Sequence, residues 1–246
     1  TYFKAREEHK IVSKAFLVAL AITSDGAREI VGFDVFDAED NYSWQTFFKD
    51  LKSRGLEGVH MVISDAHKSI LRAITKTYSE AAWQRCQVHF IRNILEETPT
   101  RFKEGLKTEL RRMFNAPTID ESRSIRDEII NDYTSVASKA VEILDNGFED
   151  SMTVMQLPEG LRTKLRSSNW IERLNREFKR RSDVIQIFPN AASVLRLMGA
   201  VAIEYNDQIS MKQRLFTGNT FNRIKLEVLP KLKDIASTQQ ALLDAA

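Results

Sequence analysis

Residues 14–36 have the sequence KAFLVALAITSDGAREIVGFDVF, and this stretch decides the fold class. Its first part, 14–22, is an apolar run with β-branched and aromatic members, which is typical of a buried strand. Ser24-Asp25-Gly26 is a hairpin turn signal, and 29–36 then returns as a second apolar run. Together with a short extended segment after Thr1, the pattern predicts three successive antiparallel strands over 2–6, 14–23 and 29–36.

Helix and strand patterns alternate from this meander to residue 95. Residues 44–54 have helical spacing of apolar side chains, and 59–63 is a short apolar strand that ends before Asp65. A helix follows, and residues 82–86 then form a strand that leads into a helix near His89. The order predicts an α/β fold with a mixed five-stranded sheet flanked by helices. The strands ending at Asp65 and Cys86 are expected to lie parallel to the first strand.

The remaining chain has helical patterns. Residues 96–165 contain no convincing strand and predict an all-helical insertion, while long helices are expected over 169–182 and about 191–206. The predicted organisation is a first core part over 1–95, the insertion over 96–165, a second core part over 166–212 and a C-terminal tail over 213–246.

Composition excludes several classes of protein. The chain has 43% hydrophobic and 28% charged residues, which is an ordinary globular balance, and it has no apolar run long enough to span a membrane. A single cysteine, Cys86, excludes a disulfide framework and favours an intracellular setting. No glycine-rich phosphate loop is present. Because the sequence begins with Thr1 and not Met, we expect a piece of a longer protein.

Positive charge is concentrated in one segment although the net charge is only +2. Residues 162–181 contain eight basic residues against Glu172 and Glu177. The basic residues are Arg162, Lys164, Arg166, Arg173, Arg176, Lys179, Arg180 and Arg181. Such a cluster can neutralise phosphates, but a solvated helix face has the same composition, and charge alone does not separate the two interpretations.

Two carboxylates are candidates for catalysis. Asp65 follows a central strand, where α/β folds bind ligands and where a carboxylate suits Mg²⁺, although an aspartate before a helix can also be an N-cap. Glu172 flanks the apolar stripe of its helix among amides and cations. The alternative for Glu172 is an ion pair with Arg176 one turn away.

Cys86 and His89 form a Cys-x-x-His spacing. A structural zinc site needs four ligands, and a cysteine-rich module is impossible with one cysteine. A nucleophilic Cys-His pair lacks a visible orienting acid. A structural role, with a buried thiol beside a hydrogen-bonded imidazole, is the favoured interpretation.

Several segments together resemble the Mutator-type transposases of bacterial insertion sequences. They are TYFK (1–4), VISDAH (62–67), WQRCQVHF (83–90), NWIERLNREFKRR (169–181) and FPN (188–190). The resemblance extends to about residue 206 and implies a ribonuclease-H-like fold with a helical insertion. It also implies an Asp-Asp-Glu site in which Asp65 is the second Asp and Glu172 the Glu. Cys86 and His89 match the family's Cys-x-x-His signature. The family's first Asp falls two positions before Thr1, so this fragment is expected to be inactive by itself.

The resemblance implies DNA strand cleavage and strand transfer with two Mg²⁺ or Mn²⁺ ions held by Asp65, Glu172 and the first Asp. The expected partners are transposon ends, target DNA and further copies of the protein, with no membrane, in the bacterial cytoplasm or nucleoid. The residues expected to contact DNA phosphates are Arg173, Arg176, Lys179, Arg180 and Arg181. The alternatives are another ribonuclease-H-like nuclease, or a non-catalytic DNA-binding or assembly module.

Overall fold

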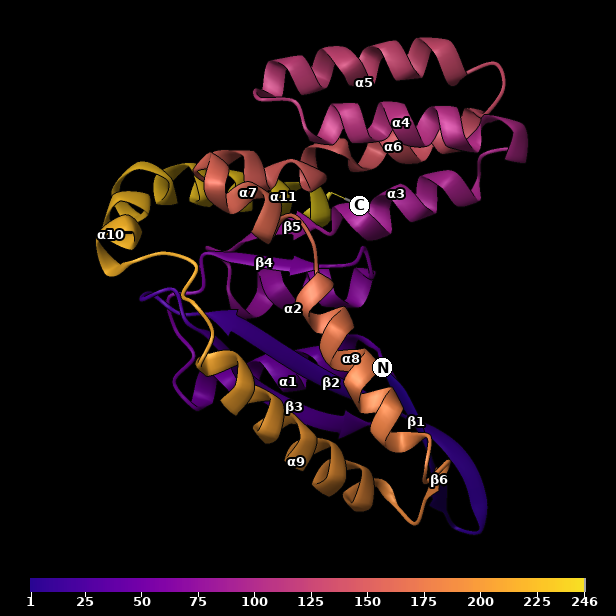
Figure 1. Cartoon of the computed structure of the whole chain (residues 1–246), viewed down its shortest axis with the longest axis vertical. Coiled ribbons are helices and arrows are strands. Elements are labelled where there is room, and N and C mark those ends of the chain that lie inside the picture. The colour runs from indigo at the N-terminus through magenta and orange to yellow at the C-terminus, as the bar shows by residue number, and fades with distance from the viewer. Residues whose placement is uncertain (246) are drawn as a thin grey trace. The chain divides into compact units, whose positions relative to one another are not determined.

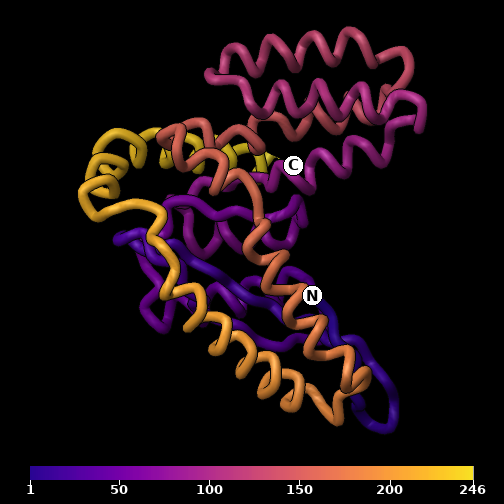
Figure 2. The backbone as a smooth tube through the Cα atoms, in the orientation of Figure 1, coloured from indigo at the N-terminus to yellow at the C-terminus, as the bar shows by residue number. Residues whose placement is uncertain are grey.

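The computed structural model of the chain describes residues 1–245, which form two compact units (Figure 1). Unit 1 comprises Thr1–Val59, Lys68–Glu80 and Asn169–Pro230, and unit 2 comprises His60–His67, Ala81–Ser168 and Lys231–Ala246. Each unit therefore combines segments from distant parts of the sequence, as the colours of the tube in Figure 2 show. None of the helices within residues 1–245 combines the length and apolarity needed to cross a bilayer.

Unit 1 is built on a four-stranded mixed sheet. Strands β1 (Tyr2–Glu7), β2 (Lys10–Ile22) and β3 (Arg28–Phe36) are antiparallel, which confirms the predicted meander. A two-residue strand, β6 (Ile187–Phe188), pairs in parallel with β1, so the strand order is β3-β2-β1-β6. Sequence patterns did not predict β6, because two residues carry no periodicity.

The two hairpin turns differ in how well the sequence indicates them. Gly26 ends the predicted Ser-Asp-Gly turn with φ of +82°, a conformation that glycine adopts without strain. A Cβ at this position would lie 2.2 Å from the carbonyl oxygen of Phe216, so glycine is required there for space as well. The turn between β1 and β2 places Glu8 and His9 at positive φ instead, with no glycine to signal it.

Helices cover both faces of this sheet. Adjacent residues of a strand point to opposite faces. On β3, Gly32 faces Leu51 of α1 (Asn41–Ser53), and Phe33 faces Gly199 of α9 (Ala191–Ser210). Helix α8 (Asn169–Ser182) packs beside α9 and against β2 (Figure 1). The other helices of the unit are α2 (Lys68–Thr77), which packs against α1, and α10 (Gly218–Glu227).

An aromatic cluster forms the core between the sheet, α8 and α9. Phe3 and Phe16 from the sheet, Phe178 from α8 and Phe188 from β6 are all buried. Their rings meet edge to face, with centroids 5.0 Å apart for Phe16 and Phe178 and 6.0 Å apart for Phe3 and Phe188. Burial of Phe188 against Phe3 explains why the short β6 segment occupies the edge of β1.

Unit 2 combines a small sheet with a helical core. Strands β4 (Met61–Ser64) and β5 (Ala82–Arg85) are parallel and form a sheet of their own. The helices are α3 (Gln87–Glu96), α4 (Lys103–Phe114), α5 (Ile119–Tyr133), α6 (Ser138–Ser151), α7 (Glu159–Leu165) and most of α11 (Leu229–Asp244), with short 3-10 turns at Thr100–Phe102 and Thr153–Gln156. Residues 96–165 contain helices without a strand, as predicted.

The prediction of one five-stranded sheet is not confirmed. The strands expected in it are divided between a four-stranded sheet, which includes the unpredicted β6, and the separate β4–β5 pair. Edge pairing depends on which segment reaches a strand in three dimensions, and strand patterns in the sequence do not contain that information. The α/β class is confirmed, and a ribonuclease-H-like sheet stays a prediction.

Candidate functional site

Asp65 lies at the carboxyl end of the β4–β5 sheet. It is the first residue after β4 and is half-buried. Its Oδ1 accepts a hydrogen bond from the backbone N–H of His67 at 3.4 Å. Helix α2 begins only at Lys68, so Asp65 does not occupy the N-cap position of that helix. The carboxylate therefore follows a strand end, which is the position the sequence predicted for a metal-binding acid.

Cys86 lies at the same edge of the sheet, because β4 and β5 are parallel and in register. Ser64 pairs with Arg85, and the N–H of Cys86 donates to the carbonyl oxygen of Ser64 at 2.7 Å. The indole N–H of Trp83 donates to Ser64 Oγ at 2.9 Å. The structure thus brings Asp65 and Cys86 to neighbouring strand ends, held together by bonds through Ser64.

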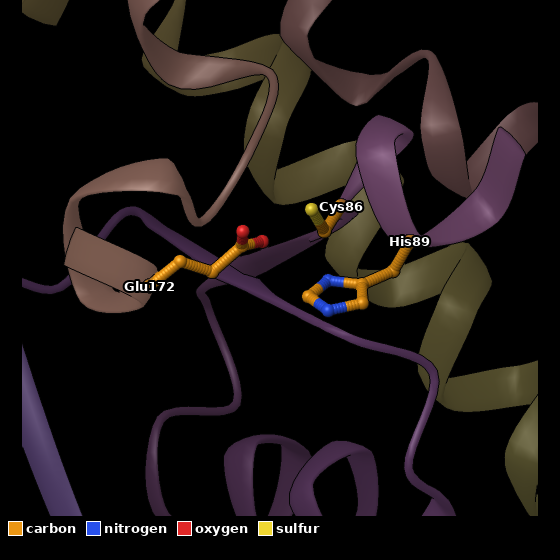
Figure 3. Close-up of side chains that lie close together, drawn as sticks. All are labelled: Cys86, His89 and Glu172. Carbon is orange, nitrogen blue, oxygen red and sulfur yellow. The ribbon is translucent and has the colours of Figure 1, made fainter. Parts of the chain in front are cut away.

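His89 stands beside Cys86 on the first turn of α3 (Figure 3). The thiol sulfur and a ring nitrogen lie within 4.8 Å of each other. The N–H and hydroxyl of Ser168 donate to Cys86 Sγ at 3.4 Å and 3.3 Å. Burial raises the pKa of the Cys86 thiol, but hydrogen bonds with His89 and Ser168 lower it, and the result is a pKa of about 7. Cys86 is fully buried at a strand end, as predicted.

Glu172 lies on the first turn of α8, in unit 1 (Figure 3). It is half-buried, whereas Leu174 and Phe178 on the predicted apolar stripe are fully buried. Arg176 makes no ion pair among the described residues, so the alternative Glu172–Arg176 pair is not formed. Asp65 belongs to unit 2, and the expected approach of the two carboxylates stays a prediction.

The basic residues of α8 fall into two groups. In the second half of the helix, Arg180 contacts Glu177 at 2.5 Å, and Arg181 contacts Glu177 and Glu204, each at 3.2 Å. The hydrogen bonds from Arg180 and then Arg181 lower the pKa of Glu177 to about 2. The other two arginines, Arg173 and Arg176, are exposed and have no carboxylate partner within residues 1–245.

Lys179 is directed toward the sheet. Its ammonium group donates to the carbonyl oxygen of Tyr2 and lies 4.8 Å from the ring centroid of Phe3. A cation over an aromatic face is stabilised by the ring quadrupole. Lys179 therefore joins α8 to β1, which helical spacing could not show.

Lys14 is a buried cation in unit 1 that forms ion pairs with two carboxylates. Its ammonium group binds Asp37 at 2.6 Å and Glu7 at 2.7 Å, and these bonds raise its pKa. Asp37 is therefore part of a structural ion-pair network at the end of the meander.

One cationic site in unit 1 was missed by the sequence analysis. Arg28, Arg173 and Lys212 line a common pocket with Trp170 and Tyr205. Of these only Arg173 was singled out, as part of the basic cluster. Arg28 and Lys212 come from segments far from α8 in the sequence, and no spacing pattern connects them.

Comparison with known proteins assigns the chain to a family. A family model described as "Transposase, Mutator family" matches residues 1–211. The transposase for insertion sequence element IS256 in transposon Tn4001 of Staphylococcus aureus is 42% identical over 209 residues, covering 84% of this chain and 53% of the relative. The transposase for IS1081 of Mycobacterium tuberculosis is 38% identical over 205 residues, covering 83% and 49%. The chain spans about half the length of these curated relatives.

Proposed function

Because the chain belongs to the Mutator family of transposases, we propose that it forms the part of a DNA transposase that cleaves DNA and transfers the cut strand. The family match over residues 1–211 carries the proposal, since it includes both candidate acids. The names of the relatives supply the activity, and the position of Asp65 at a strand end supplies a chemical basis for it.

Asp65 and Glu172 are the residues that would hold divalent metal ions. Carboxylate oxygens are the ligands that Mg²⁺ prefers, and the single weak bond from His67 leaves most of the Asp65 carboxylate available. Bound metal ions would activate the attacking oxygen and stabilise the leaving oxygen at phosphorus. In the first step a water molecule breaks a phosphodiester bond and leaves a 3′-hydroxyl. In the second, this hydroxyl attacks a target phosphodiester and displaces a new 3′-hydroxyl.

DNA phosphates would be positioned by Arg173 and Arg176 of α8. Arg176 lies four residues after Glu172, one helical turn away on the same side. Arg173 and Arg176 can donate to phosphate without first breaking an ion pair, unlike Arg180 and Arg181. Phosphate contacts carry no sequence information, so this helix would position DNA but not read its bases.

Cys86 and His89 would have a structural role. The Cys86 thiol joins β5, α3 and Ser168, and it lies beside the strand end that presents Asp65. Metal analysis of the purified chain tests this role. Stoichiometric zinc that disappears in C86S would contradict it.

The test of the proposed activity uses a chain extended upstream to supply the expected first Asp. With Mg²⁺ or Mn²⁺ it should nick transposon-end DNA and join the ends to target DNA. D65A and E172A should each lower cleavage at least about 10³-fold, a loss on the scale of removing a catalytic group (~4 kcal/mol). DNA affinity in both variants should remain within a few-fold of the parent.

The alternatives predict different products. Cleavage of RNA–DNA hybrids without strand transfer would favour another ribonuclease-H-like nuclease. DNA binding without cleavage would favour an assembly module. The charge-matched variants D50A and E227A, at exposed positions of unit 1, should cleave as the parent does. A parent-like rate in D65A or E172A would remove that residue from the active site.

A further inference from the structure

The cationic pocket of unit 1 brings together residues from three elements that are distant in the sequence. Arg28 begins β3, Trp170 and Arg173 lie on the first turns of α8, and Lys212 follows the end of α9, where Tyr205 completes the wall. The cavity holds about 20 Å³, room for a water molecule or one oxygen atom of an anion. A nucleobase is too large for it. One oxygen atom of an anion therefore fits in the pocket, whereas a base does not.

Positive charge in this pocket is not neutralised by the protein. No acidic side chain lines it, and none of Arg28, Arg173 and Lys212 forms an ion pair within residues 1–245. Elsewhere in the same unit, the buried cation Lys14 has two carboxylates and Arg181 has two. Three cations that converge on one concave site repel each other and concentrate a positive field there. An anion would relieve this repulsion.

Two of the pocket residues are held in place before any ligand arrives. Arg28 donates through Nη2 to the carbonyl oxygen of Gln213 at 2.9 Å, and its guanidinium carbon lies 5.4 Å from the ring centroid of Trp170. One bond to a carbonyl leaves most of the five N–H donors of a guanidinium for a ligand. Trp170 and Arg173 are three residues apart and therefore lie on the same side of α8. The pocket is thus preorganised, which lowers the entropic cost of binding.

We propose that Arg28, Arg173 and Lys212 bind one phosphate group of the DNA backbone. The guanidinium fork matches two phosphate oxygens, and the ammonium group of Lys212 supplies a third donor. The site rests on the proposed function for the identity of its ligand as DNA. It adds β3 and the end of α9 to the surface that contacts DNA, which the basic cluster of α8 alone did not include.

The principal experiment compares two charge-matched double variants of the chain in a salt titration of duplex binding. R28Q/K212Q removes two pocket cations and keeps Arg173, whereas K49Q/R196Q removes two exposed cations of unit 1 for which residues 1–245 supply no carboxylate partner. Loss of one phosphate contact should lower the salt slope by about one unit. We expect this change in R28Q/K212Q, with about tenfold weaker binding at 0.1 M salt, for transposon-end and unrelated duplexes alike. K49Q/R196Q should change binding less than twofold. Equal effects of the two variants would overturn the proposal.

A third variant separates lost charge from lost structure. R28K keeps the charge but not the fork, so it should retain most of the salt slope if the wild-type fold is kept, as circular dichroism can show. If Arg176→Gln lowers the slope while R28Q/K212Q does not, the pocket proposal fails and the proposed function stands. If the unaltered chain binds no DNA, the proposed function fails with it.

Tryptophan fluorescence identifies the source of the phosphate. Trp44 and Trp83 are buried, and Trp170 is half-buried in the pocket, so iodide should quench mainly Trp170. For a backbone site, micromolar duplex DNA should protect Trp170 from iodide, and inorganic phosphate should do so only at millimolar concentration. R28Q/K212Q should weaken iodide quenching but not quenching by neutral acrylamide. Protection by micromolar inorganic phosphate, with none by DNA, would assign the pocket to a free anion and overturn the proposal.

Discussion

On α8, Arg173 and Arg176 form no ion pair within residues 1–245, whereas Arg180 and Arg181 share Glu177 and Arg181 also binds Glu204. Each pair contributes two arginines to the same basic cluster in the sequence. Their difference shows that the number of cations on a helix does not by itself determine its affinity for DNA. An arginine in an ion pair must break its bond to the carboxylate before it can bind a phosphate. The net free energy gained from the phosphate contact is therefore smaller.

The largest effect should separate the two pairs of arginines directly. R173Q/R176Q should lower the salt slope of duplex binding by about two units, because each lost phosphate contact removes about one. R180Q/R181Q removes the same formal charge but should lower the slope by less than one unit. Filter binding or fluorescence anisotropy from 0.05 to 0.3 M salt measures both. Equal slopes in the two variants would show that the ion pairs do not weaken the contacts of Arg180 and Arg181 with DNA phosphates.

A smaller effect of opposite sign is expected when the acid is removed. E177Q frees Arg180 and releases Arg181 from one of its two partners, so that both can meet phosphates. DNA affinity should rise a few-fold at low salt, and the slope should steepen by up to about one unit. E204Q is the matched control and should produce a smaller gain, because Glu177 continues to hold both arginines. Unchanged or weaker binding in E177Q would refute the competition between Glu177 and phosphate.

The smallest effect concerns stability against pH. The pKa of Glu177 is about 2 in the folded chain against an ordinary value of 4.5, so the ionised group favours the folded state. This contribution is fully present above pH 4.5 and disappears as the pH falls through 2. The stability difference between the parent and E177Q should therefore shrink between pH 5 and pH 2 in urea unfolding. A difference that stays constant over that range would mean that the ion pairs do not stabilise the fold.

How far the site could be predicted from the sequence depends on whether its interactions are local or join segments distant in the sequence. Asp65 and Cys86 were placed correctly at two strand ends, because a short apolar run followed by a polar residue marks the end of a buried strand. Their meeting at one edge followed from the parallel pairing of β4 and β5. The part of Lys179 in joining α8 to β1 was not predicted, since helical spacing places a residue on a face but does not say what lies opposite.

Sequence by itself determined the α/β class, the meander, the helical segment 96–165 and the bounds of α8, with those of α1 and α9 predicted to within a few residues. These features rest on periodicity, capping and turn residues, which act over a few neighbouring positions. Asn190, for example, caps α9 through a bond to Ser193 only three residues away. Such interactions are present in any window of the chain that is long enough to contain them.

Only the tertiary structure decided the division into two sheets, the pairing of β6 with β1, the ion pairs of α8 and the pocket of Arg28, Arg173 and Lys212. Each depends on segments that are distant in sequence and become neighbours when the aromatic core of unit 1 forms. Burial of Phe188 against Phe3 brings β6 to β1, and packing of α8 and α9 on the sheet brings Lys212 to Arg28. Hydrophobic burial depends on apolar surface area and not on the charged residues that are nearby in the sequence. A local charge pattern therefore does not show which cations will lack an acidic partner in the folded chain.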